Sequence, residues 1–445
     1  MQDSAQLLID RAAKLVEAAK RAGADASDAV VARQGSTSVQ VRHGKVEGTD
    51  SSEADNISLR VFVGRKVASI AAAASSDVDT LAERAISMAK VSPDDEFNGL
   101  AREDLLAPEL ADLDLYDTTE IAAAQLTEDA LATEEAALVV SGVTKSSGAS
   151  ASAGVGGMVL ATSHGFQGSY SGTRFSRGVS VIAGEGTGME RDYDFSSRQF
   201  YADLDPAANI GRSAGERAAK RVNPRKMTTQ SVAVVFDPRV ARGLIGHING
   251  AINGAAIARK SSFLQDKMGK KIANSSITII DDPNIVRGQA SRPIDGEGVK
   301  GERLIMLEDG ILRNWYLSSS IGKELGLETN GRGARSGTSV SAASSNTWVL
   351  PGDISPDEMI RSVGTGFYCN EVFGQGVNMV TGEYSRGASG FWIEDGEIAF
   401  PVSEITIASN MQEMFLSMEP ANDLDMNFST AAPTILVPKM TLAGS

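Results

Sequence analysis

Residues 243–260, GLIGHINGAINGAAIARK, form a glycine-studded run that follows the short apolar stretch SVAVVF. Apolar residues at helical spacing predict a helix, with Gly246, Gly250 and Gly254 recurring every four residues along one face. Each interior glycine costs a helix about 1 kcal/mol relative to alanine, so three cost about 3 kcal/mol. We therefore expect close approach of a neighbouring sheet, helix or subunit to hold this helix in place.

His247 lies in the middle of this helix, and a helical histidine can be one half of a metal site. A zinc peptidase helix needs a second imidazole and a carboxylate that deprotonates the metal-bound water. The next residue here is Ile248, and Ile252 follows where a histidine would be needed. The other two histidines, His43 and His164, each precede a glycine and are typical of turns. A packed or hydrogen-bonded His247 is therefore expected.

On both sides of the helix the pattern is that of strands. SVAVVF at 231–236 predicts a short buried strand ending at an Asp-Pro pair, and alternating apolar runs continue towards the C-terminus. Glu-Asp-Gly occurs at 308–310 and again at 394–396, each time between apolar runs, which predicts hairpin turns. Residues 227–445 are therefore expected to form a β-rich C-terminal domain.

The N-terminal part combines helices with hairpins. Amphipathic helices are predicted over 4–22 and 77–90, with hairpins over 36–48 and 57–72 between them. This order predicts an α+β domain over residues 1–92.

The remaining segments connect this domain to the C-terminal one. Residues 93–118 are strongly acidic, contain two prolines and are expected to be a solvated acidic linker. Residues 119–226, with helices near 119–138 and 206–221 and Gly/Ser-rich strands between, form a middle α+β region that completes the N-terminal half. The predicted fold class is thus α+β, an N-terminal α/β hairpin-and-helix region plus a β-rich C-terminal domain.

The amino-acid composition limits the possible binding partners and the cellular location of the protein. The net charge of −15 and the lack of a basic stripe argue against direct nucleic-acid binding. The single cysteine, Cys369, excludes an internal disulfide and a thiolate-rich zinc site. No apolar run approaches the length of a membrane span, and the first residues do not have the pattern of a signal peptide. A reduced, cytoplasmic location without membrane contact is expected.

Several longer runs resemble the TldD/PmbA family (peptidase U62, "modulator of DNA gyrase"), specifically its PmbA/TldE branch. The most telling is GTGFYCNEVFGQGVNMVTGEYSRGASGFWIEDGEIAFPVSEITIASN at 364–410; others are the glycine helix, RPIDGEGVKGERLIMLEDGILRNWYL at 292–317 and NDLDMNFSTAAPTILVPKMTLAGS at 422–445. The match covers essentially the whole chain but is weaker in the N-terminal half. The resemblance implies a two-subunit cytoplasmic metalloprotease acting in proteolysis of unfolded or small peptides. In it, a TldD-type subunit holds zinc with HExxxH and a further cysteine, and the PmbA-type subunit is its partner.

The zinc motif implied by the resemblance is degenerate in this chain. Its first histidine matches His247, but its glutamate and second histidine fall on Ile248 and Ile252. Ala431-Ala432-Pro433 stands where the cysteine ligand would be expected, and Cys369 lies in a different segment. One imidazole cannot hold zinc with useful affinity, so we expect no metal in this chain, no intact catalytic residues, and zinc in a TldD-like partner.

Two other sets of residues could serve a site. Glu383, Tyr384, Ser385 and Arg386 are candidates for a peptide groove, although a structural turn is the simpler interpretation. The carboxylate pairs Asp281-Asp282 and Asp295 with Glu297 are expected at solvated hairpin edges, with a carboxylate-bound metal as the alternative.

Three functional hypotheses follow. The first is a non-catalytic subunit that dimerises with a TldD-like protein and helps to bind an extended peptide, for instance by pairing at a sheet edge. The second is a stand-alone hydrolase with an unrecognised site. The third is a peptide-binding scaffold that pairs with itself.

Overall fold

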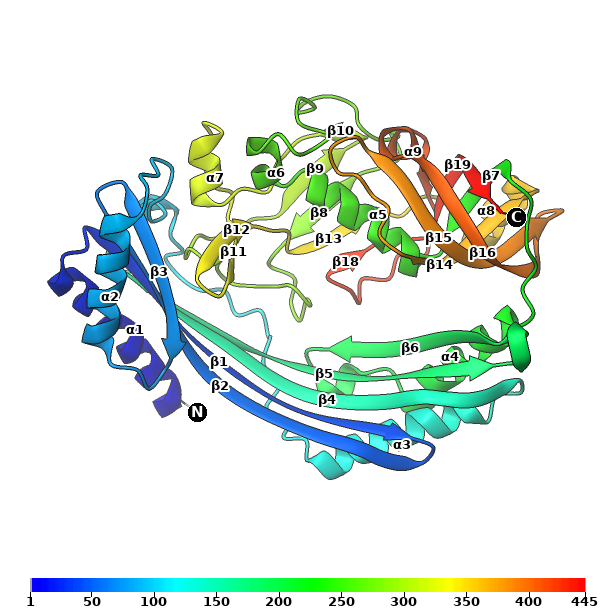
Figure 1. The fold of residues 1–445 in the computed structure, drawn as a ribbon, viewed down its shortest axis with the longest axis horizontal. Helices are drawn as coiled ribbons and strands as arrows, with labels where there is room; N and C mark the ends of the chain where they lie inside the picture. The colour runs from blue at the N-terminus through cyan, green and yellow to red at the C-terminus, as the bar shows by residue number, and fades with distance from the viewer. Residues whose placement is uncertain (1, 445) are drawn as a thin grey trace.

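A large curved sheet lies opposite a β-rich C-terminal domain in the computed structural model, which describes residues 2–444 (Figure 1). The sheet has the order β3-β2-β1-β4-β5-β6. Every neighbouring pair in it is antiparallel. The elements of this half are α1 (Gln2–Ala22), β1 (Ala26–Arg42), β2 (Lys45–Val63), β3 (Lys66–Ala73), α2 (Val78–Val91), η1 (Glu103–Leu105), α3 (Ala123–Leu138), β4 (Val143–Thr162), β5 (Gln167–Ala183), η2 (Gly186–Gly188), β6 (Glu190–Arg198), η3 (Tyr201–Asp203) and α4 (Ala207–Arg221).

The predicted N-terminal and middle regions share this one sheet, because β1 pairs with β4 along almost its whole length, from Asp28 opposite Thr162 to Val41 opposite Ala149. Helices cover one face of the sheet at its two ends (Figure 1). Ala29 and Val31 of β1 pack in a core cluster with α1 and α2, whereas residues further along β1 pack with α3 and α4. The opposite face looks towards the C-terminal domain.

The C-terminal domain contains two larger sheets and a short hairpin. One sheet has the order β16-β15-β14-β7-β19-β17, and β16 also pairs with β19, which closes the strands into a ring; the other is β10-β9-β8-β13-β18. The elements are β7 (Gln230–Phe236), α5 (Pro238–Ala251), α6 (Gly254–Ala258), β8 (Ile279–Asp282), β9 (Leu304–Glu308), β10 (Ile311–Leu312), α7 (Ser319–Glu324), β11 (Gly333–Ser336), β12 (Ser339–Ala342), β13 (Asn346–Val349), α8 (Pro356–Val363), β14 (Gly366–Phe373), β15 (Glu383–Glu394), β16 (Glu397–Asn410), α9 (Met411–Ser417), β17 (Glu419–Pro420), β18 (Thr430–Ala431) and β19 (Ile435–Ala443).

The predicted α+β class with a β-rich C-terminal domain is confirmed. Both Glu-Asp-Gly turns are hairpins, between β9 and β10 and between β15 and β16, and Asp309, Gly310, Asp395 and Gly396 all have positive φ. Two consecutive positive φ angles are what a type I′ turn requires, which explains the Asp-Gly pair. No helix among residues 2–444 has the length and apolar character needed to cross a membrane.

The acidic linker is only partly solvated. Its backbone bonds to both halves: Leu113 O accepts from Arg287 N and Leu115 O from Thr173 N. The apolar side chains of Ala101, Ala107, Leu113 and Leu115 are buried. The leucines and alanines between its acidic residues therefore anchor the segment along the junction of the two halves.

The glycine helix is split in two. α5 ends at Ala251, and the Asn253 side chain caps α6 by accepting from Ala255 N. A Cβ on Gly254 would lie 2.7 Å from Tyr316 O, so the expected close approach is correct there. It is wrong for Gly246, which faces open space, and for Gly250, which meets only the Met379 side chain at 3.4 Å. The isoleucines of α5 take the core side, so these glycines point away from it.

Alanine substitutions should separate the two kinds of glycine. Gly246→Ala should raise the free energy of unfolding by about 0.5–1 kcal/mol, because alanine favours the helix and meets no neighbour. Gly254→Ala should lower it by about 1–3 kcal/mol, because its methyl would overlap Ile321 and Tyr316 O. Urea unfolding of both variants measures the two signs, and equal signs would contradict this assignment.

Candidate functional site

Strand β7 and helix α5 position the residues that the resemblance aligns with a zinc motif. Asp237 directly follows β7 and caps α5 by accepting from Arg239 N, with Pro238 in the first turn. Ile248 and Ile252 are fully buried in the main core cluster. His247 is half-buried on a different side of the helix, next to the exposed Gly246.

His247 packs against an aromatic ring. Its imidazole lies edge-on to the Tyr384 ring with the centroids 6.2 Å apart, and no hydrogen bond joins it to another residue in the described part of the chain. Burial, and then the positive charge of Arg386, lower the pKa of His247. The imidazole is therefore neutral at neutral pH.

The structure brings together part of the predicted groove set. Along β15, Tyr384 is buried and Arg386 half-buried, whereas Glu383 and Ser385 are exposed. Because successive side chains of a strand point to opposite faces, Tyr384 and Arg386 share the side of His247, and Glu383 and Ser385 share the other. Two candidates from separate motifs, the helix histidine and the Tyr-Arg pair, thus form one cluster.

The segment aligned with the third zinc ligand also lies beside α5. Strand β18 packs against this helix, and Ala431 and Ala432 are buried. The side chains at the four aligned positions are therefore one imidazole, two isoleucines and an alanine methyl, a donor set that does not fit zinc. Cys369 is buried on β14, burial raises the pKa of its thiol, and its Sγ donates to Glu371 O. Within residues 2–444, no three His, Cys, Asp or Glu side chains are placed to hold a metal ion.

The expectation of solvated carboxylate pairs is wrong for Asp281, Asp295 and Glu297, which are all buried. Asp281 accepts from Arg332 Nε at 2.6 Å, from Ser345 N and Oγ, and from Thr347 Oγ1. Arg332 is itself fully buried, and its remaining donors reach backbone carbonyls. This pair holds the β8 and β13 region together rather than forming an open ligand site.

Asp295 and Glu297 belong to a charged cluster between the two halves. Asp28 of the large sheet pairs with Arg60 at 2.5 Å and with Arg335 of the C-terminal domain at 2.8 Å, and Arg60 also lies 4.0 Å from Glu297. Burial, and then the charge of Glu297, raise the pKa of Asp295 to about 7. The cluster contains three carboxyl groups and two guanidinium groups. One proton on Asp295 therefore makes the net charge of the cluster zero.

This raised pKa predicts a pH effect on stability. A carboxyl with a higher pKa in the folded state contributes stability below its unfolded pKa of about 4 and loses it as pH rises towards about 7, by up to about 1.4 kcal/mol per pH unit. Asp295→Asn should remove this component, so the wild type should lose stability relative to the variant between these pH values and not above them. Urea unfolding of both proteins from pH 5 to 8 measures the difference; parallel curves would contradict it.

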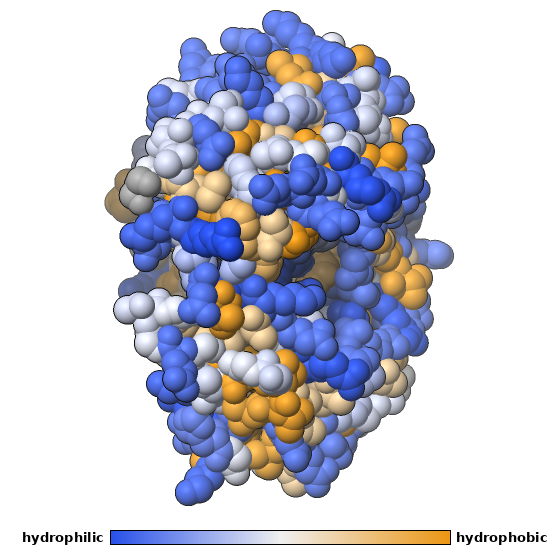
Figure 2. Space-filling model, turned by 90° about the vertical axis from the view of Figure 1, so that its right-hand side faces the viewer, coloured by the Kyte–Doolittle hydropathy of each residue, from blue (hydrophilic) through white to orange (hydrophobic). Residues whose placement is uncertain are grey.

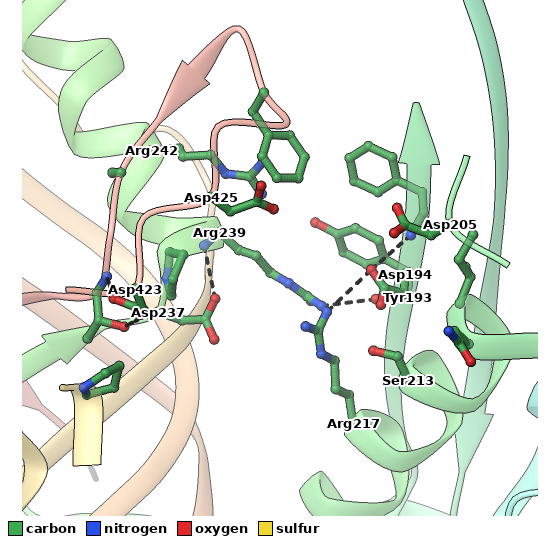
Figure 3. A pocket seen from close by; sticks show the side chains of 18 of the residues that line it. Tyr193, Asp194, Asp205, Ser213, Arg217, Asp237, Arg239, Arg242, Asp423 and Asp425 are labelled. Atoms are coloured by element: carbon green, nitrogen blue, oxygen red, sulfur yellow. Dashed lines mark hydrogen bonds and ion pairs between the residues drawn. The ribbon is translucent and has the colours of Figure 1, made fainter. Parts of the chain in front are cut away.

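A cavity of about 620 Å³ lies at the junction of β6, α4, the start of α5 and the 423–434 segment. Figure 3 shows Arg239 and Arg242 reaching into it from α5, opposite Tyr193, Asp194 and Asp205. A hollow opens between the two halves on the side of the molecule seen in Figure 2. Sequence reasoning missed this cavity, because its walls come from segments that are far apart in the sequence. The only local signal is the alternation of acidic and aromatic residues in ERDYDF at 190–195.

The chain is similar to known proteins over nearly its whole length. Three family models match, the PmbA/TldA metallopeptidase domain 1 over residues 27–89, central domain over 116–222 and C-terminal domain over 229–444. The metalloprotease PmbA of Escherichia coli O157:H7 is 36% identical over 94% of this chain and 92% of its own length. A PmbA homologue of Haemophilus influenzae is also 36% identical, over 97% of this chain and 94% of its own length.

Solved structures share the fold. A Bacteroides thetaiotaomicron protein described as a candidate modulator of DNA gyrase superposes with a TM-score of 0.90 at 25% identity, covering 98% of both chains. TldE of Thermococcus kodakarensis superposes with a TM-score of 0.86 at 20% identity, covering 98% of this chain and all of its own. With 36% identity to PmbA proteins over almost its full length, the chain belongs to the PmbA/TldD metallopeptidase family.

Proposed function

We propose that this chain is the PmbA/TldE-type, non-catalytic subunit of a TldD/TldE-like cytoplasmic metalloprotease that degrades unfolded or small peptides. Its partner is a TldD-like subunit, which holds the zinc. The observation that carries the proposal is the pair of fully buried isoleucines on α5, Ile248 and Ile252, beside the buried alanines of β18. The residue after His247, where the motif carries its glutamate, is Ile248, and no three His, Cys, Asp or Glu side chains among residues 2–444 are placed to hold a metal ion, so this chain binds and orients substrate rather than activating water.

The free edge of β6 is poorly suited to pairing with a peptide strand. Its outward carbonyls at Arg191 and Tyr193 accept from the Arg221 and Arg239 side chains. The N–H groups of Tyr193 and Phe195 donate to the preceding aspartates, Asp192 and Asp194. Side chains thus occupy most of this edge, which favours recognition of peptides through side chains lining the hollow.

Metal content and activity test the proposal. The isolated chain should contain no stoichiometric zinc by elemental analysis and should cleave no peptide. Co-purified with its TldD-like partner, the pair should contain zinc and should cleave unstructured peptides faster than the partner alone. Zinc-dependent cleavage by this chain alone would overturn the proposal.

Two alternatives give different results in the same experiments. A stand-alone hydrolase predicts cleavage by the isolated chain that survives His247→Ala. A self-paired peptide-binding scaffold predicts a homodimer in size-exclusion chromatography that does not exchange with the TldD-like protein.

A further inference from the structure

One face of α5 connects the cavity in Figure 3 to His247. At 100° per residue, Arg239, Arg242, Gly246, His247 and Gly250 fall within less than half of the helix circumference. Gly246 and Gly250 are exposed, and a Cβ on Gly246 would meet nothing. The path from the two arginines to the imidazole is therefore bare helix backbone, against which an extended chain can lie closely.

Arg242 differs from the other guanidinium groups of the cavity. Arg198 pairs with Asp205 at 2.7 Å, Arg217 with Asp194 at 3.5 Å and Arg239 with Asp192 at 2.7 Å. In the described part of the chain, no carboxylate lies within ion-pair distance of Arg242. Its guanidinium stacks on the Phe428 ring, 3.6 Å from the centroid, so its N–H edge stays available. Burial lowers the pKa of Arg242, and the nearby Tyr193, Asp237 and Asp425 oppose this effect only in part.

The carboxylates of the cavity are mostly occupied by other donors. Asp237 accepts from Arg239 N and Tyr368 Oη, and Asp423 accepts from Thr434 N and Oγ1. Asp425 is exposed and accepts from Asn427 N. Among the described residues, Arg242 is thus the guanidinium group of this cavity that has no ion-pair partner, and an anionic ligand could pair with it.

Aromatic rings next to this point supply an apolar surface. Tyr193 and Phe195 stack with centroids 6.3 Å apart, and each remains about 40% exposed, although both lie in the wall of a cavity. Phe195 also meets Phe428 edge-on at 6.1 Å. Such rings favour an apolar or aromatic side chain beside the bound anion.

We propose that this cavity captures the C-terminal carboxylate of a peptide through Arg242, with the last side chain against Phe195 and Phe428. The peptide backbone then runs over Gly246 towards His247. His247 lies five residues after Arg242, a rise of about 7.5 Å along the helix, or about two residues of extended peptide. This inference rests on the proposed function and adds a substrate class: peptides with a free C-terminus and an apolar or aromatic last residue.

Peptide end groups test the inference without altering the protein. The probes are the fluorescein-labelled peptide Gly-Ala-Gly-Ala-Phe as the free acid and as the C-terminal amide, titrated into the full chain alone and with its TldD-like partner. A bidentate, charge-assisted contact predicts at least tenfold tighter binding of the acid. Replacing the last residue by glycine should weaken binding of the acid several-fold, because the aromatic contact is lost.

A variant locates the contact. Arg242→Gln should abolish the preference for the acid, while Arg313→Gln, which removes an exposed arginine paired with Glu308, should keep it. Equal binding of acid and amide by the wild type would overturn this inference and leave the proposed function standing. A preference that persists in Arg242→Gln would also overturn it. If neither peptide binds the chain alone or with its partner, the proposed function fails as well.

Discussion

Replacing Arg332 by methionine is expected to lower the free energy of unfolding by about 3–5 kcal/mol, because it leaves the carboxylate of Asp281 buried without its counter-charge. Both side chains have no exposed surface, and no water can replace the lost guanidinium contacts. Methionine fills a similar volume, so the loss of stability comes mainly from removing the positive charge of the guanidinium group. Urea unfolding followed by circular dichroism measures it.

Two control variants isolate the cause. Arg313→Met breaks a pair of similar chemistry with Glu308, 3.0 Å apart, in which both side chains are nearly half exposed. Exposed pairs contribute about 0–1 kcal/mol, so this variant should be nearly neutral. The double variant Asp281→Asn/Arg332→Met should recover part of the loss, because no unpaired charge remains. Equal losses in Arg332→Met and Arg313→Met would contradict the assigned role.

Burial of these charges could not be predicted from local pattern. Asp281 and Arg332 are far apart in sequence: Asp281 follows a run of isoleucines just before an Asp-Pro pair, and Arg332 stands between two glycines. A local pattern predicts elements well when the cause is local, as in the Asp-Gly turns, where positive φ dictates the residue type. A buried ion pair has a non-local cause, because its stability depends on a partner supplied by tertiary folding.

In the candidate site, too, the sequence predicts features with a local cause and does not predict those that depend on tertiary folding. The resemblance identified His247 and its isoleucine neighbours, and β15 contributed Tyr384 and Arg386 as separate candidates. Their contact depends on the packing of α5 against the ring of strands that includes β15, which no spacing reveals. The two exposed glycines of α5 were misjudged because helical spacing alone does not say which face meets the core. The hydrophobic side is set by Ile245 and Ile248, and the glycines lie opposite them.

Restoring the lost glutamate of the motif should destabilise this chain rather than create an enzyme. Ile248 is fully buried in the core, so Ile248→Glu places a carboxyl where it must be protonated to fold. Protonating a glutamate with an ordinary pKa of about 4.3 at pH 7 costs about 4 kcal/mol, in addition to the lost apolar packing. Because the folded pKa is raised, the loss should be smaller at pH 5 than at pH 7. Ile248→Val, which only shortens the side chain, should cost about 0.5–1.5 kcal/mol at either pH.

Adding the second histidine should not rescue metal binding. Ile252 is the C-cap of α5, its N–H is bonded to Ile248 O and its side chain is fully buried, so a histidine there would have to leave the core to meet His247. We expect the double variant Ile248→Glu/Ile252→His to unfold at lower urea than the wild type and to hold far less than one zinc per chain. A stably folded double variant with one bound zinc would show that this helix can still present a catalytic face. In that case the buried isoleucines would not be the reason that this subunit depends on a partner.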